Sequence, residues 1–171
     1  MPLKKTELKK WLDGFKKVAI LGVGSGLRQD DNAGTVTAKK IEELIASSKI
    51  SKSIKIFLGE TAPENLSGQI REFRPTHIII IDSADMGLKP GETRLVDIKN
   101  ISGISFSTHR MPLSILAGYF TSSFDCKVML IGIQPYSIEF SEELSGIVSK
   151  AVGILSKQIA EVLTKIAPEK A

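Results

Sequence analysis

Three short segments of the chain carry side chains that could bind a metal or move a proton. The first contains the neighbouring acids Asp30 and Asp31, the second contains Asp82, and the third contains His109. Two carboxylates and one imidazole form a three-ligand oxygen and nitrogen donor set with open positions, which suits nickel, zinc or iron better than magnesium. The chain has neither a G-x-S-x-G nor an H-E-x-x-H pattern, so any hydrolysis must depend on a metal or a carboxylate.

These segments can meet because each of them follows an apolar stretch that we expect to be a β-strand. Asp82 directly follows four consecutive isoleucines, Ile78 to Ile81. A strand that is apolar on both faces is typical of the centre of a parallel sheet covered by helices. Open α/β sheets bind ligands beyond the carboxyl ends of their strands, so the acids and His109 are predicted to line one crevice.

The rest of the chain alternates between strand and helix patterns. Strands are predicted at residues 17–22, 54–58, 77–82 and 127–133, with a short edge strand at 93–96 or 103–106. Helices are predicted at residues 6–13, 33–47, 61–73, 112–120 and 141–166. Three of these helices have start signals: Thr61 to Glu64 has the form of a capping box, Pro112 opens one, and Ser141 precedes Glu142 and Glu143. The expected fold is α/β, a three-layer α/β/α sandwich on a twisted, mostly parallel five-stranded sheet.

Two nucleotide-binding loops and a phospho-acceptor domain fit the sequence poorly. The glycines after the first strand lack G-x-G-x-x-G spacing, no Gly-Lys-Ser/Thr is present, and Asp30 and Asp31 would repel a pyrophosphate. A receiver domain needs a lysine at the end of its last strand, whereas residues 131–136 contain none. Nucleotide binding and phospho-signalling are therefore not expected.

Length and composition indicate one globular domain, residues 1–171. The chain is 42% hydrophobic and 25% charged, with a net charge of +4 and 6% aromatic residues. Without a basic stripe interleaved with aromatic residues, we expect no nucleic-acid partner. No apolar run approaches the length of a membrane span, and no signal-peptide pattern is present, so the expected location is the cytoplasm. The single cysteine, Cys126, heads an apolar strand and is predicted to be a core residue, as is His77.

Several stretches, taken together, resemble the hydrogenase maturation endopeptidases, which trim the large subunit of [NiFe]-hydrogenases. The similarity extends over about residues 18–136, in the same order and at plausible spacing, and is strongest to the hydrogenase-3 and membrane-bound hydrogenase type. It lies in the Gly22-x-Gly24 loop with Asp30 and Asp31, Ala62-Pro63-Glu64-Asn65, Arg74-Pro75-Thr76, residues 81–92, residues 107–113 and Gly132-Ile133-Gln134-Pro135. Residues 1–16 resemble an extra N-terminal helix outside the shared part.

The resemblance implies that the protein removes the C-terminal extension of a large-subunit precursor after nickel insertion. The family's nickel-contacting residues fall on Asp31, Asp82 and His109, with Asp31 and Asp82 as the candidate catalytic acids. Nickel would arrive with the precursor rather than as a resident cofactor, and the free protein would be a monomer. The expected substrate contacts around this trio are Ser25, Asp30, Asp85 and Thr108.

Two positions depart from the family pattern, and two other functions stay open. The family usually has Asn at Ser25 and Gly at Asn32, so we expect an altered loop geometry in which Asn32 could adopt a left-handed turn. The alternatives are a hydrolase with its own metal, and a non-enzymatic accessory module that binds nickel or the precursor. The choice between an aspartic and a metal-assisted mechanism is also open.

Overall fold

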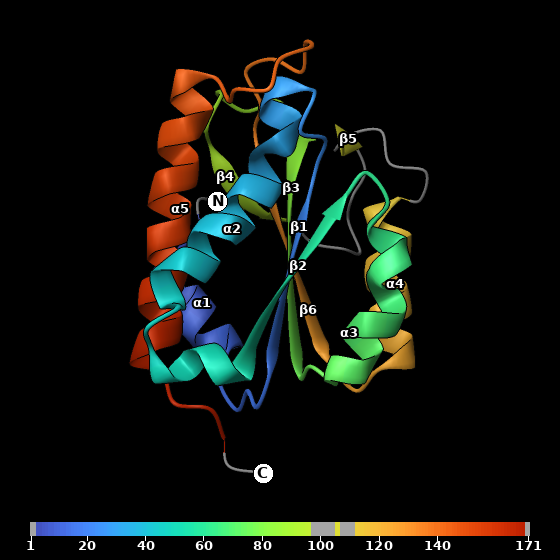
Figure 1. Cartoon of the computed structure of the whole chain (residues 1–171), viewed down its shortest axis with the longest axis vertical. Helices are drawn as coiled ribbons and strands as arrows, with labels where there is room; N and C mark the ends of the chain where they lie inside the picture. Colours follow the sequence, from blue (N-terminus) through green and yellow to red (C-terminus); the bar gives the residue numbers. More distant parts are fainter. Residues whose placement is uncertain (1–2, 97–104, 107–111, 170–171) are drawn as a thin grey trace.

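The computed structural model describes residues 3–96, 105–106 and 112–169, and it forms three layers (Figure 1). A central sheet is covered on one face by α1, α2 and α5 and on the other by α3 and α4. The bounds are α1 (Lys5–Trp11), α2 (Ala33–Ile45), α3 (Ser67–Phe73), α4 (Leu113–Ser123) and α5 (Gly146–Lys165). The predicted α/β/α sandwich is confirmed.

The sheet is mostly parallel, as the strand pattern indicated. The strands are β1 (Val18–Val23), β2 (Ile54–Glu60), β3 (His77–Asp85), β4 (Thr93–Val96), β5 (Ser105–Phe106) and β6 (Lys127–Ile133). Their order is β2-β1-β3-β6-β4, in which the first four strands are parallel and β4 is antiparallel to β6. The short β5 pairs antiparallel with the end of β3, so both of the segments predicted as alternative edge strands contain strand residues.

The isoleucines of β3 divide between the two sides of the sheet. Ile79 and Ile81 belong to the apolar cluster beneath α1, α2 and α5, whereas Ile78 and Ile80 belong to the cluster beneath α3 and α4. All four are fully buried. Because successive side chains of a strand point to opposite faces, a continuous apolar run satisfies both helical layers at once.

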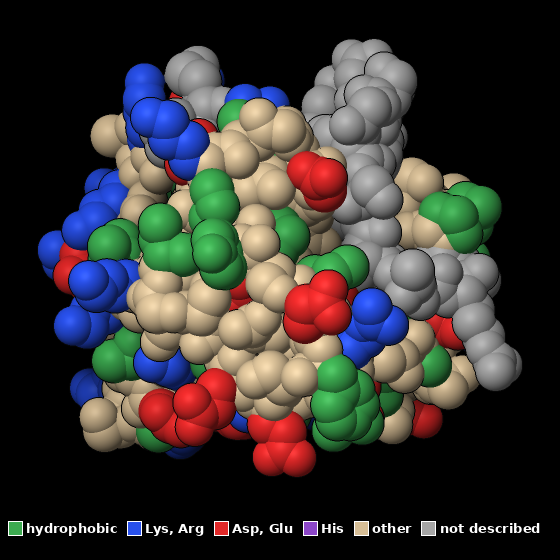
Figure 2. Space-filling view, turned by 90° about the horizontal axis from the view of Figure 1, so that it is seen from above, with side chains coloured by type: hydrophobic (Ala, Val, Ile, Leu, Met, Phe, Trp, Pro, Cys, Tyr) green, Lys and Arg blue, Asp and Glu red, His purple; other side chains and the backbone are tan. Residues whose placement is uncertain are grey.

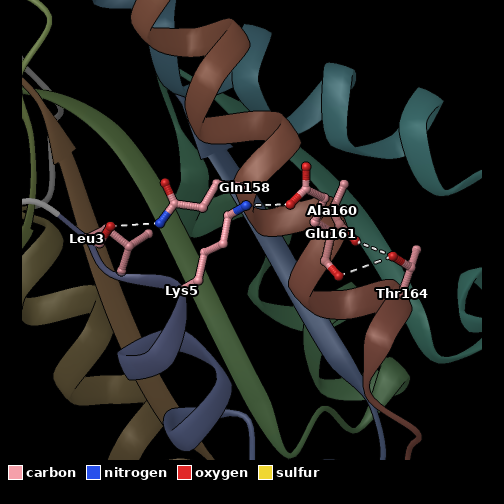
Figure 3. Close-up of polar contacts among 6 residues, drawn as sticks. All are labelled: Leu3, Lys5, Gln158, Ala160, Glu161 and Thr164. Atoms are coloured by element: carbon pink, nitrogen blue, oxygen red, sulfur yellow. Dashed lines mark hydrogen bonds and ion pairs between the residues drawn. The ribbon is translucent and has the colours of Figure 1, made fainter.

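The N-terminal helix α1 packs against α5. Leu8, Leu12 and Phe15 are buried in the cluster that includes α2 and α5. Figure 3 shows two polar contacts at its start: Gln158 Nε2 donates to the Leu3 carbonyl at 2.7 Å, and Lys5 forms an ion pair with Glu161. The segment predicted as an extra helix is therefore part of this molecule's own hydrophobic core.

Two predicted helix starts are wrong. The last helix begins at Gly146, after Ser145, and not at Ser141, because the backbone of Ser141 pairs with Leu27 and Gln29 instead. Thr61 makes no capping box, since the short 3₁₀ helix η3 (Pro63–Leu66) follows Ala62 with no side-chain cap, and α3 starts only at Ser67.

The third strand is also longer than predicted. β3 continues three residues beyond Asp82, to Asp85, because Ala84 and Asp85 pair with β5. Asp82 therefore lies inside the strand and not at its last residue. Within the described residues, no helix is both long and apolar enough to cross a membrane.

Candidate functional site

Asp82 lies where β1 and β3 stop pairing. The last β1–β3 pair joins Gly22 to Ile81, so Asp82 is the first residue of β3 beyond its pairing with β1. The chain leaves β1 toward β2 on one side and leaves β3 toward β6 on the other, which makes this the topological switch point of the sheet. The Asp82 side chain is fully buried, and its Oδ1 accepts a hydrogen bond from the Ser83 amide at 2.8 Å.

Two glycines bring the first acidic loop onto this edge. A Cβ atom at Gly24, where φ is +139°, would lie 1.8 Å from the Asp31 carbonyl oxygen. A Cβ atom at Gly34 would lie 2.1 Å from the Ile81 carbonyl oxygen and 2.4 Å from that of Val23. Only glycine permits these approaches, so the loop and the start of α2 lie directly against the backbone that leads into Asp82.

Asp31 lies in the short 3₁₀ helix η1 (Gln29–Asn32), which contacts β3. Its Oδ2 accepts a hydrogen bond from the Ser25 amide at 2.8 Å, and its side chain is 5% exposed. Among the described residues, no other group donates a hydrogen bond to this carboxylate. Asp31 and Asp82 thus come from neighbouring elements at the same edge of the sheet.

Asp30, the other acid of the pair, is directed into a different loop. Its carboxylate accepts four hydrogen bonds of 2.8 to 3.1 Å, from the amides of Tyr136, Ser137 and Ser145 and from the Ser145 hydroxyl. The side chain is fully buried. These contacts give Asp30 a clear positioning role, because they fix residues 136–145 beside the acidic loop.

Asp85 and Gln134 order the turn that follows β3. Gln134 Oε1 accepts hydrogen bonds from the amides of Met86 and Leu88, and Gln134 Nε2 donates to Asp85 Oδ1 at 3.1 Å. That amide, together with the Gly87 amide, holds the pKa of the Asp85 carboxyl below its usual range. The sequence pattern included Gln134 but assigned it no role, because a contact between residues so far apart leaves no local signal.

The remaining predicted site residues lie partly outside the described residues. His109 and Thr108 do so, and their predicted roles stay predictions. Within the described part of the chain, no three His, Cys, Asp or Glu side chains form a metal-binding group. Ser25 is described: its amide binds Asp31, and its hydroxyl accepts from the Leu27 amide at 3.3 Å.

In the loop between β1 and α2, the residue with a left-handed backbone conformation is not the one that the sequence suggested. Asn32 has a φ of −75° and therefore does not supply a left-handed turn. Gln29 does, with a φ of 41°, and its amide donates to the Ser141 carbonyl at 2.7 Å. The long-range hydrogen bond stabilises a conformation that is otherwise uncommon for a non-glycine residue.

Cys126 and His77 have no described contact with this edge. Burial, with a smaller effect of Asp125, raises the pKa of the Cys126 thiol to about 11, so the reactive thiolate is scarce at neutral pH. His77 starts β3 at the opposite end of the strand and packs edge-on against the Trp11 ring at 4.8 Å.

Comparison with known proteins decides the family. The profile described as hydrogenase maturation protease matches residues 38–162. The chain belongs to the hydrogenase maturation protease family. The resemblance predicted from the sequence is confirmed, and a protein of this family is a peptidase.

Three relatives show how far the family likeness extends. The hydrogenase 3 maturation protease of Escherichia coli K12 is 34% identical over 134 residues, which cover 78% of this chain and 82% of that protein. The crystal structure of the [NiFe] hydrogenase maturation protease HycI from Thermococcus kodakarensis is 30% identical, with a TM-score of 0.81 and 92% and 98% of the two chains covered. The solution structure of the endopeptidase HycI from E. coli is 33% identical, with a TM-score of 0.72 and 85% and 90% covered.

Proposed function

We propose that this hydrogenase maturation protease removes the C-terminal extension of a [NiFe]-hydrogenase large-subunit precursor after nickel has been inserted. Family membership supports a role in processing a hydrogenase, and the names of its relatives support endopeptidase activity. The observation that carries the assignment of the site is the convergence of Asp31 and Asp82 on the switch-point edge of the sheet.

In this proposal nickel belongs to the substrate and is recognised by Asp31, Asp82 and His109. Carboxylate oxygens and an imidazole nitrogen are suitable nickel ligands. Asp31 is nearly buried, and within the described part of the chain its carboxylate accepts one amide hydrogen bond, at Oδ2, which orients the group. A metal that reaches this edge while held by the precursor would place the adjacent scissile bond in the crevice.

The reaction is hydrolysis of one peptide bond. Water adds to the carbonyl carbon, the C–N bond breaks, and the leaving nitrogen takes up a proton. Asp31 and Asp82 are the described groups at this edge that can accept a proton from the attacking water. The precursor's nickel can in addition polarise the carbonyl oxygen or lower the pKa of that water. Asp30 keeps residues 136–145 in place beside these groups, and Ser25, Asp85 and Thr108 would contact the peptide.

The test is cleavage of purified precursor, with and without nickel, followed by intact mass. We expect the wild-type protein to release the C-terminal peptide from the nickel-loaded precursor only. Asp82→Asn and His109→Ala should reduce that rate by about a hundredfold or more, because each removes a group that contacts the reacting centre. Asp13→Asn, at an exposed acid in the first segment of the chain, is the matched control and should cleave at the wild-type rate.

Other outcomes identify the alternatives. An accessory module would bind the precursor and release no peptide. A hydrolase with a resident metal would purify with near-stoichiometric metal and would lose activity to a chelator. Full activity of Asp82→Asn or His109→Ala would disprove the assigned site.

A further inference from the structure

Two loops beside the acidic edge expose large apolar side chains next to one another. One loop precedes η1 and the other connects β6 to α5. The exposed side chains, here called the loop patch, are Leu27 at 51%, Tyr136 at 69%, Ile138 at 44% and Phe140 at 81% exposed. Single exposed apolar residues are ordinary, but a group on adjoining loops indicates a contact surface.

The loop patch is held firmly in place. The Gln29 amide donates to the Ser141 carbonyl at 2.7 Å, and the Ser141 amide donates to the Leu27 carbonyl at 3.1 Å. Arg28 Nε donates to the Ile138 carbonyl at 3.3 Å. The four hydrogen bonds to Asp30 attach the same loop to the residue that precedes Asp31. A surface fixed in this way loses little conformational entropy when a partner binds.

The position of the loop patch relates it to the candidate catalytic acids. The loop between β6 and α5 lies at the top of Figure 1, at the end of the molecule where the parallel strands finish. Figure 2 looks down on that end and shows hydrophobic side chains gathered on it together with acidic ones, while Lys and Arg gather along the left edge. Because its side chains are 44% to 81% exposed, the loop patch is accessible to the surface of another protein.

The charges around the loop patch indicate the kind of partner. Glu139, Glu142 and Glu143 are exposed within the same loop, and Arg28 is the neighbouring cation. This region is therefore acidic on a chain whose net charge is +4. Two copies of the chain facing each other here would oppose glutamates to glutamates, which disfavours a symmetric dimer. The surface that complements the loop patch is therefore an apolar one rimmed by Lys or Arg.

We infer that the loop patch docks the folded body of the large-subunit precursor, through an apolar surface with a basic rim, while the C-terminal segment enters the acidic edge. This inference rests on the proposed function. Docking at a site next to the reacting groups raises the local concentration of the scissile bond, so it should affect precursor binding rather than the chemical step.

The experiment measures binding and cleavage for a patch variant and a matched control. Leu27→Ser with Phe140→Ser removes two exposed apolar side chains from the loop patch. Leu44→Ser with Ile154→Ser removes two exposed apolar side chains from helices α2 and α5. Precursor affinity is measured by interferometry, and cleavage of nickel-loaded precursor gives kcat and KM. For the patch variant, Kd and KM should rise about tenfold or more while kcat stays within about twofold.

The charges provide a second arm. Glu142→Lys with Glu143→Lys should slow association with the precursor and weaken its dependence on salt. Unchanged Kd and KM in the patch variant, or an effect equal to that of the control, would overturn the inference. The inference would also be overturned if the patch variant changed self-association, measured by sedimentation velocity, and still bound the precursor normally. That result would assign the loop patch to contact with a second copy of the chain. If wild-type protein binds but does not cut, docking stands and the proposed function fails.

Discussion

At the residue scale, the neighbouring acids Asp30 and Asp31 have different environments. Both are acidic residues in one loop. The sequence therefore predicts that at least one takes part in catalysis or metal binding, but it does not show which one. The structure distinguishes them through partners far along the chain: Asp30 binds residues 136–145, and Asp31 binds only the Ser25 amide among the described residues. The distinction depends on tertiary contacts and therefore has no local pattern.

Asp30 should be important for stability. Asp30→Asn replaces a buried carboxylate that accepts four hydrogen bonds with an amide whose NH₂ group opposes donors. We expect a loss of about 2–3 kcal/mol in the free energy of unfolding. Urea denaturation followed by circular dichroism measures this loss. Asp13→Asn, at an exposed position, should unfold at the wild-type urea concentration. Equal midpoints for all three proteins would show that the four contacts contribute nothing.

His77 should make the protein less stable in mild acid. Burial, and to a smaller extent the positive charge of Lys127, lower the pKa of His77 from its usual value. As pH falls, the unfolded chain protonates this histidine first, near its ordinary pKa of about 6.5. Below that pH the unfolded state therefore holds more protons, and stability falls; above it, the contribution is fully present.

The comparison that isolates this effect is His77→Gln. Urea midpoints of both proteins at about pH 7.5 and about pH 5.5 bracket the titration of an unperturbed histidine. The wild-type midpoint should decrease more between these values than the midpoint of His77→Gln. His109 is present in both proteins and cancels in the difference. A steeper decrease in the variant would show that protonated His77 is stabilised by the fold.

At the element scale, the sequence predicts strands better than helix starts. The strands follow from runs such as Ile78 to Ile81, whose burial on both faces is a local property of the chain. The start of α5, in contrast, does not follow from the local sequence. Ser141, Glu142 and Glu143 resemble a helix start. However, the backbone of Ser141 forms hydrogen bonds with Leu27 and Gln29, and the helix begins only at Gly146. A long-range pairing overrides a good local signal.

The contact of α2 with the sheet gives a prediction at this scale. Gly34→Ala would place a methyl carbon 2.1 Å from the Ile81 carbonyl oxygen, so the backbone of α2 or of β3 would have to shift. We expect a loss of about 3 kcal/mol or more and, because α2 must shift away from the strand that carries Asp82, reduced precursor cleavage. Thermal unfolding and the cleavage assay measure the two effects.

Gly153→Ala is the matched control for this substitution. Gly153 also lies in a helix, α5, and a Cβ atom there would meet no atom within 4 Å. It should stabilise the protein by about 0.5–1 kcal/mol, since alanine favours helix over glycine. A Gly34→Ala protein as stable as Gly153→Ala would contradict the close approach of α2 to β3.

At the scale of the whole molecule, the candidate catalytic acids and the contact between α1 and α5 lie at opposite ends. The acidic edge is at the top of Figure 1, and α1 packs against α5 in the lower half. The layered fold was predictable from the alternation of strand and helix patterns alone. The convergence of the acids was predictable only as a consequence of parallel topology, because the glycine contacts that set it become visible only in three dimensions.

This separation predicts that α1 can be weakened without impairing the site. Leu8 is fully buried, so Leu8→Ala should cost about 2–5 kcal/mol and lower the Tm. Below that Tm, kcat for the nickel-loaded precursor should equal the wild-type value, because nothing at the acidic edge has moved. Lys5→Ala removes the exposed ion pair with Glu161 and should leave the Tm nearly unchanged, since solvent screens such pairs. A fall in kcat for folded Leu8→Ala would mean that the core under α1 positions Asp31 and Asp82. A larger loss of Tm in Lys5→Ala than in Leu8→Ala would mean that charge, not packing, attaches α1.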